Sequence, residues 1–158
     1  SDLVADDDLG RVFGHDLRAV GVQFRAGRHE AGVPTGRCII VVTPDAQRTM
    51  NTFLGVSSLL HVGDLDEDTI AAGAVLYMEG YLYDRPEAKA AFRAAASVAH
   101  GHGRQVSLTL SDSFCVDRHR SDFRALVTDE VDVLFGNEAE LLSLYEVDRI
   151  DEIGRAHV

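Results

Sequence analysis

The second half of the chain alternates short apolar runs with longer stretches of helical periodicity, and this alternation restricts the fold more than any other feature. Buried strands are predicted at three runs, Ala74–Met78, Gln105–Leu110 and Val131–Phe135. Helices are predicted over Glu87–His100 and Val116–Thr128, and a further helix begins at Glu138. Strands that alternate with helices through short connections form a parallel sheet covered by helices, so we expect an α/β fold.

The first half of the chain has a different pattern. The acidic run Asp6–Asp8 supplies the start of a helix predicted over 8–20, which puts five apolar residues on one face: Leu9, Val12, Phe13, Leu17 and Val20. Cys38–Val42 and Arg48–Leu54 then predict two strands joined by a turn. We expect the chain to open on a helix rather than a strand. The alternation in the second strand indicates a hairpin with one unburied face, a small flap over a site.

Composition limits the kinds of partner. The 158 residues suffice for one domain, and an apolar content of 46% allows a packed core. A formal net charge of −11 argues against sequence-independent nucleic-acid binding, which needs a basic surface. No apolar run is long enough to span a bilayer, so no membrane partner is expected. The two cysteines, Cys38 and Cys115, make no disulfide framework, and we expect a cytoplasmic protein.

Lysine is nearly absent. The one lysine, Lys89, lies inside a predicted helix, and no Gly-rich turn ends in Lys-Ser or Lys-Thr. A classical P-loop nucleotide site is therefore excluded, and any phosphate must meet arginine, backbone N–H groups or a metal. A phosphoacceptor receiver domain needs a lysine beside its acidic site, so we reject that fold as well.

The junction between the last strand and the last helix allows two interpretations. Asn137 and Glu140 have the spacing of a capping box, in which each side chain bonds the other's backbone. The carboxyl end of a strand that enters a helix is also where α/β proteins bind anions and metals. The residues alone favour capping, without deciding between the two. Asp112, after the second strand, could likewise contact a substrate or begin a turn.

Four stretches, in order, resemble the ribokinase-like (PfkB-type) family of sugar and nucleoside kinases, and within it the adenosine kinase branch. They are ADDDLGRVFGHDLRAVGV (5–22), PTGRCIIVVTPDAQRTMNTFLGVS (34–57), VSLTLSDSF (106–114) and DVLFGNEAE (132–140). These stretches are similar to the family's early helix, its lid hairpin, the strand and loop after the lid, and its Asn-x-x-Glu motif. The resemblance implies a ribokinase-like, Rossmann-type parallel sheet flanked by helices, with a small β-hairpin lid.

The resemblance also implies an activity and its residues. The family's enzymes transfer a phosphoryl group from ATP to a primary hydroxyl, here of a nucleoside (adenosine favoured) or a sugar. Asn137 and Glu140 match the residues that organise Mg²⁺, its waters and the nucleotide phosphates. Arg48 matches the lid arginine that approaches the transferred phosphoryl group. Cys38, Leu54 and Leu82 match, or lie near, positions that line the nucleoside pocket.

The sequence departs from the family in two places. The family's catalytic base is the Asp of a Gly-Ala-Gly-Asp loop, which does not occur here, and the glycine-rich N-terminal substrate segment is missing. We therefore expect the central portion of a kinase, incomplete relative to the family and inactive alone. Its expected parts are a leading helix with its connection to the lid (1–32), the lid hairpin (33–56) and an α/β core segment (57–158).

A second hypothesis is that the 158-residue chain is the natural protein. It would then be a non-catalytic ligand-binding or oligomerisation module on a kinase-derived scaffold. An uncovered hairpin face can pair with another subunit, so a homodimer is a candidate under either hypothesis.

Overall fold

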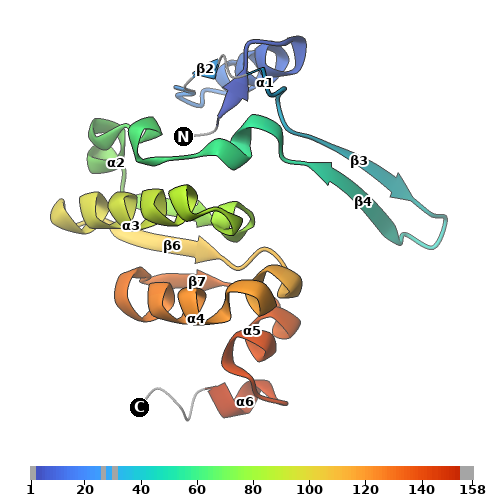
Figure 1. Cartoon of the computed structure of the whole chain (residues 1–158), viewed down its shortest axis with the longest axis vertical. Coiled ribbons are helices and arrows are strands. Elements are labelled where there is room, and N and C mark those ends of the chain that lie inside the picture. The colour runs from blue at the N-terminus through green and yellow to red at the C-terminus, as the bar shows by residue number, and fades with distance from the viewer. Residues whose placement is uncertain (1–2, 26–27, 30–31, 154–158) are drawn as a thin grey trace. The chain divides into compact units, whose positions relative to one another are not determined.

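The computed structural model describes residues 3–25, 28–29 and 32–153, which belong to two compact units (Figure 1). The first unit runs to Asp64 and the second begins at Leu65. The expected parts 1–32 and 57–158 each include residues outside the described ranges. Within those ranges, no helix is both long enough and apolar enough to cross a membrane.

The second unit is built on a parallel three-stranded sheet in the order β5–β6–β7. The strands span Val75–Glu79, Gln105–Thr109 and Val133–Phe135, close to the predicted runs. The register pairs Glu79 with Thr109 and Thr109 with Phe135. All three strands therefore end at the same side of the sheet, which we call the carboxyl edge.

Helices α3 (Pro86–Gly101) and α4 (Ser113–Glu130) connect the strands in the way that the alternation predicted (Figure 1). The buried positions of α3 recur at helical spacing and are mostly alanines: Ala88, Ala91, Phe92, Ala95, Ala96 and Ala99. Small side chains let this helix lie close to β5 and β6, whose Met78, Val106 and Leu108 are buried. The α/β prediction is confirmed for this unit.

The opposite face of the sheet carries exposed side chains, namely Val75, Tyr77, Val133 and Phe135. Tyr77 and Phe135 lie edge to face, with ring centroids 6.4 Å apart. The rest of the unit consists of α2 (Glu67–Ala72), the 3₁₀ helix η3 (Gly80–Asp84), α5 (Glu138–Tyr145) and α6 (Ile150–Ile153).

The first unit begins with a strand, so the prediction that the chain opens on a helix is wrong. Strand β1 (Val4–Ala5) pairs in parallel with β2 (Arg28–His29) and precedes helix α1 (Asp8–Ala19). The five apolar residues on one face of α1 do not form a buried face, because four of them are exposed: Leu9, Val12, Phe13 and Val20. The buried residues are Gly10 and Gly14. A Cβ on Gly10 would lie 2.2 Å from the Ala5 carbonyl oxygen, so only glycine lets the helix approach β1 this closely.

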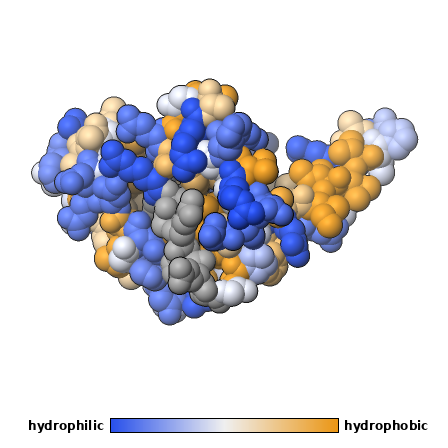
Figure 2. All heavy atoms as spheres, turned by 90° about the horizontal axis from the view of Figure 1, so that it is seen from above, coloured by the Kyte–Doolittle hydropathy of each residue, from blue (hydrophilic) through white to orange (hydrophobic). Residues whose placement is uncertain are grey.

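Strands β3 (Arg37–Val42) and β4 (Arg48–Phe53) form the predicted antiparallel hairpin. Every residue of both strands is exposed, so the hairpin has two uncovered faces rather than the single one expected. Figure 2 shows its hydrophobic side chains grouped at the surface. Short 3₁₀ helices η1 (Gly55–Leu59) and η2 (Val62–Asp64) follow.

Candidate functional site at the carboxyl edge

Three connections bring polar groups to the carboxyl edge of the sheet. Tyr81 follows β5, Ser111 and Asp112 follow β6, and the Asn137–Glu140 pair follows β7. The Tyr81 backbone N–H donates to Ser111 Oγ at 3.3 Å, which joins the first two connections. The space outside the carboxyl ends of parallel strands is where α/β sheets bind ligands. This edge is therefore the candidate site of the second unit.

Asn137 and Glu140 form the capping box that their spacing predicted. The Glu140 N–H donates to Asn137 Oδ1 at 2.9 Å, and the Asn137 N–H donates to Glu140 Oε2 at 3.1 Å. The Asn137 amide also donates from Nδ2 to Glu140 Oε1 at 2.8 Å. Glu140 is buried, with 6% of its surface exposed. The box thus holds the carboxylate in one direction at the start of α5, and its functional interpretation stays a prediction.

Asp112 is the N-cap of helix α4 and does not start an isolated turn. Its Oδ1 accepts from the Cys115 N–H at 2.7 Å. The preceding residue, Ser111, has φ of 74°, a left-handed conformation that non-glycine residues seldom adopt and that often marks functional sites. Burial, followed by the charges of Asp112 and Glu140, raises the pKa of the Tyr81 phenol above its ordinary value. The carboxyl edge therefore carries negative charge, and the chain turns sharply there at Ser111.

Two exposed aromatic residues at this edge were not among the predicted site residues. Tyr81 is 45% exposed and Phe114 is 75% exposed. Phe114 is the second residue of α4, and the strand before that helix ends at the carboxyl edge. An apolar side chain in the first turn of such a helix was the available signal.

The donor set at the edge fits a hydrated magnesium ion. Within the described ranges, no three His, Cys, Asp or Glu side chains are arranged to hold a metal ion together. Mg²⁺ commonly keeps several waters and uses one or two carboxylates together with substrate phosphates. Both Glu140 carboxylate oxygens already accept hydrogen bonds from Asn137. These residues therefore suit contact through water with an ion that arrives with a nucleotide.

In the first unit, Arg48 and Cys38 lie on the same face of the hairpin. The register pairs Arg48 with Val42 and Cys38 with Thr52, and alternate residues of a strand share a face. Both side chains are exposed, and Cys38 Sγ is 3.2 Å from Thr52 Oγ1. A cation and a small apolar group thus project from one side of the hairpin.

The two predicted pocket leucines lie in different units. Leu54 directly follows β4 in the first unit, and Leu82 lies within η3 in the second. Both are half-buried. Asn137 and Glu140 are in contact, whereas Arg48 and Cys38 share one face of the hairpin. The first pair lies in the second unit and the other pair in the first unit.

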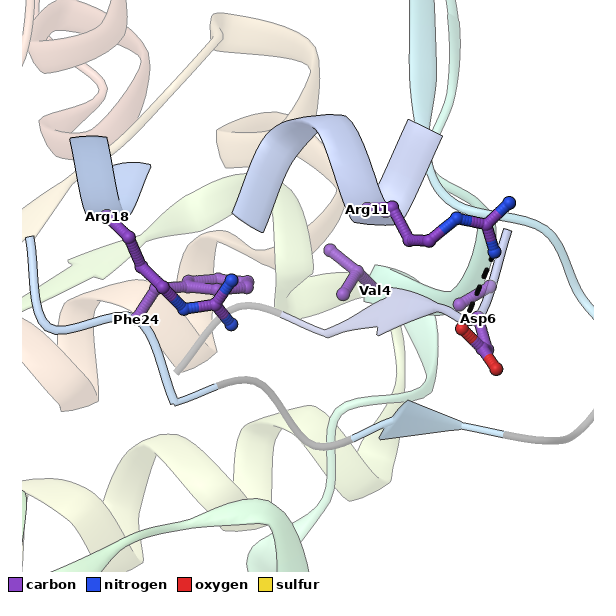
Figure 3. Close-up of a pocket in the computed structure, with 7 residues that line it drawn as sticks. Val4, Asp6, Arg11, Arg18 and Phe24 are labelled. Carbon is purple, nitrogen blue, oxygen red and sulfur yellow. Dashed lines mark ion pairs between the residues drawn. The ribbon is translucent and has the colours of Figure 1, made fainter. Parts of the chain in front are cut away.

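A small pocket of about 110 Å³ beside α1 was not indicated by the sequence (Figure 3). The Arg18 guanidinium lies over the Phe24 ring at 5.6 Å, and Arg11 pairs with Asp6 at 3.7 Å. Pockets for ordinary small-molecule ligands measure roughly 300–1,000 Å³. We assign no ligand to this smaller pocket.

Residues 3–157 match the family described as pfkB family carbohydrate kinase. The crystal structure of adenosine kinase from Sinorhizobium meliloti is 48% identical, with a TM-score of 0.90 over 96% of this chain and 47% of that one. A probable sugar kinase protein from Rhizobium etli CFN 42 is 47% identical, with a TM-score of 0.90 over 97% of this chain and 47% of that one.

A more distant structure shares the fold. A candidate ribokinase II from E. coli, solved in complex with ATP and Mg²⁺, is 17% identical, with a TM-score of 0.85 over 98% of this chain and 51% of that one. The present chain thus spans about half the length of each of these proteins. No curated protein matches it.

Proposed function

Since the chain belongs to the pfkB family of carbohydrate kinases, we propose that its residues serve an ATP-dependent kinase acting on a primary hydroxyl of a nucleoside, with adenosine favoured. The 48% identity with the S. meliloti adenosine kinase supports this acceptor. The R. etli relative, described as a probable sugar kinase at 47% identity, keeps a sugar as the alternative acceptor. The free cysteines Cys38 and Cys115 support a reducing, cytoplasmic setting.

The observation that carries the proposal is the reciprocal pair Asn137–Glu140 at the end of β7. A buried carboxylate that accepts two hydrogen bonds is directed before any ligand binds, which lowers the cost of ordering it later. Mg²⁺, when bound, would neutralise charge on the nucleotide phosphates. Glu140 would hold its waters in place, and Asn137 would hold Glu140.

The hairpin supplies the second part of the proposal. Arg48 projects from an exposed face, where a guanidinium can bond two phosphoryl oxygens at once. Cys38 on the same face, with Leu54 and Leu82, would contact the nucleoside. Closure of the hairpin over the acceptor would exclude water, which otherwise competes as the nucleophile.

In the proposed reaction the acceptor hydroxyl oxygen bonds to the γ-phosphorus as the bond to the ADP oxygen breaks. The hydroxyl proton passes to a carboxylate base, which the family supplies from a Gly-Ala-Gly-Asp loop that this sequence lacks. The 158-residue chain alone is therefore expected to be inactive.

The first measurement is the intact mass of the protein made from the native gene. If the mass is well above 17.2 kDa, the longer protein is the one to assay for kinase activity. We expect it to phosphorylate adenosine with ATP, and Glu140→Gln to lower activity about 10–100-fold, as losses of groups that orient metal ligands do. Glu138→Gln is the matched control, because Glu138 is an exposed carboxylate in the same helical turn. Equal activity of the two variants would contradict the role of Glu140.

A specific observation also favours the alternative, an oligomerisation module. Both faces of the hairpin are exposed and apolar, including Ile39, Ile40 and Met50. A native mass of 17.2 kDa with no phosphoryl transfer would contradict the kinase proposal. Light scattering that then gave twice this mass would support the module.

A further inference from the structure

Helix α4 is bent at one residue. His119 has φ of −126° and ψ of 25°, outside the helical range, so the helix consists of a short segment before it and a longer one after it. The first segment begins at the carboxyl edge and carries Phe114, with Asp112 as its N-cap. The bend therefore decides where these two residues lie relative to the rest of the edge.

Both segments are attached to α5, and the first segment is also attached to η3. In the longer one, Phe123 and Leu126 are fully buried in the core, and Arg124 Nε donates to the Leu144 carbonyl at 2.7 Å. In the first one, Cys115 Sγ lies 3.3 Å from the Gly80 carbonyl of η3. Asp117 also accepts from Ser143 Oγ at 2.6 Å, which links this segment to α5.

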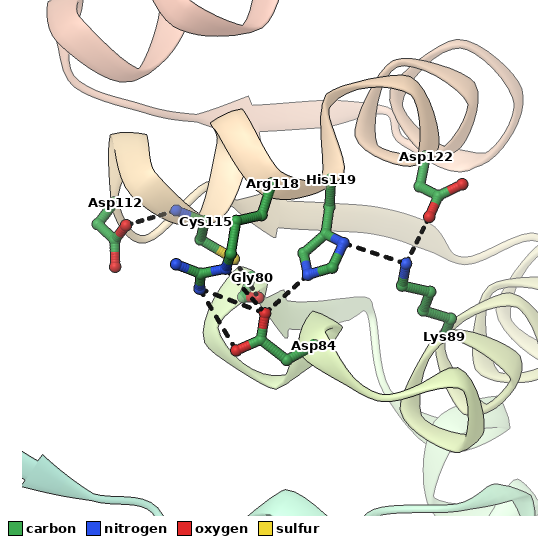
Figure 4. A network of polar contacts seen from close by, with 8 residues as sticks. All are labelled: Gly80, Asp84, Lys89, Asp112, Cys115, Arg118, His119 and Asp122. Atoms are coloured by element: carbon green, nitrogen blue, oxygen red, sulfur yellow. Dashed lines mark hydrogen bonds and ion pairs between the residues drawn. The ribbon is translucent and has the colours of Figure 1, made fainter.

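His119 joins the bend to two further elements (Figure 4). Its Nε2 lies 2.7 Å from Asp84 Oδ1 of η3, and its Nδ1 lies 3.2 Å from Lys89 Nζ of α3. Its ring meets the buried Tyr83 edge to face, with centroids 6.2 Å apart. The surrounding charges are paired as well, because Arg118 bonds Asp84 at 3.2 Å and Lys89 bonds Asp122 at 2.5 Å.

These partners leave only one neutral tautomer for the imidazole. An ammonium group has donors and no acceptor, so Nδ1 must accept from Lys89. The ring proton then lies on Nε2 and is donated to the carboxylate of Asp84, which only accepts. His119 thus connects a donor on α3 with an acceptor on η3 through a rigid ring at the bend.

We propose that His119 is a positioning residue: as the Nε2–H tautomer it fixes the bend in α4 and so holds Asp112 and Phe114 at the carboxyl edge. The role of that edge rests on the proposed kinase function, whereas the positioning itself does not. Asp84 and Lys89 are the two groups through which His119 acts.

The wild-type protein provides the first test. Nitrogen-15 NMR of the 158-residue chain at neutral pH distinguishes the two neutral tautomers and the doubly protonated ring. We expect His119 to be the Nε2–H tautomer. A proton on Nδ1 would overturn the proposal, and this result requires no variant to fold.

Two substitutions separate positioning from packing. His119→Gln keeps an amide donor for Asp84 and a carbonyl acceptor for Lys89, whereas His119→Leu keeps bulk alone. We expect the backbone amide shifts of Ser111, Asp112 and Phe114 to move in the Leu variant and to stay near wild type in the Gln variant. Unchanged shifts in the Leu variant, or equal changes in both, would overturn the proposal.

A control histidine lies at the end of α3. His102 is exposed, and its Nδ1 lies 2.9 Å from the Val98 carbonyl of its own helix, so His102→Leu should leave the edge shifts unchanged. None of these readouts requires phosphoryl transfer. Absence of kinase activity would therefore count against the proposed function and leave the positioning role to be decided by the shifts.

Discussion

At the scale of single residues, Asp7 organises the start of the first unit. Its carboxylate accepts from the Gly10 N–H at 2.8 Å, from the Thr35 N–H at 2.9 Å and from Thr35 Oγ1 at 2.7 Å. Thr35 Oγ1 in turn accepts from the Ala5 N–H at 2.9 Å. These bonds, that from Gly10 first and those from Thr35 next, lower the pKa of Asp7 from 3.8 to about 2. The Asp7 side chain thus joins β1, α1 and the segment that directly precedes the hairpin.

The lowered pKa predicts how stability depends on pH. The folded state favours ionised Asp7, so its contribution is present above pH 3.8 and is lost as the pH falls toward about 2. Asp7→Asn should lower the melting temperature at pH 6 and flatten its fall across this acid range. Circular dichroism melts check this, with the exposed Asp16→Asn on the same helix as the control. Parallel pH profiles of Asp7→Asn and the wild type would contradict the prediction.

At the scale of elements, the base of the hairpin depends on a close backbone approach. A Cβ on Gly36 would lie 2.6 Å from the Leu54 carbonyl oxygen, a backbone atom that cannot move without shifting the strand. Gly36→Ala should therefore lower the free energy of unfolding of the first unit by about 1–3 kcal/mol, as overpacking does. Gly101→Ala, where nothing lies within 4 Å, should cause no loss. Urea titration measures both, and equal stability of the two variants would contradict the prediction.

Sequence patterns predicted some of the helices and strands and missed others, for physical reasons. The three strands of the second unit and the helices between them were predicted because short apolar runs alternate repeatedly with stretches of helical periodicity. Strand β1 has two residues and therefore no periodicity to detect. The apolar pattern of α1 predicted the helix but not its buried side, because close approach to β1 depends on Gly10. Likewise, the capping box at Asn137 was local and predictable, but the exposure of Phe114 depends on what packs around it.

At the scale of the whole molecule, the second unit contains a core of its own. Val106, Leu108, Phe123, Leu126 and Leu144 are all fully buried within it. A chain of residues 65–158 should therefore fold alone and unfold in one cooperative transition. Fluorescence and circular dichroism during urea titration should give coincident curves. A gradual, non-cooperative change would contradict the prediction.

The enclosure of Lys89 has a practical consequence. This side chain lies 5.2 Å from the Tyr83 ring centroid and bonds Asp122 and His119, inside helix α3. It is also the chain's one lysine, so an endoprotease specific for lysine has a single peptide bond to cut. Cleavage there requires α3 to unwind, and the digestion rate of the unlabelled protein therefore reports how often the second unit opens.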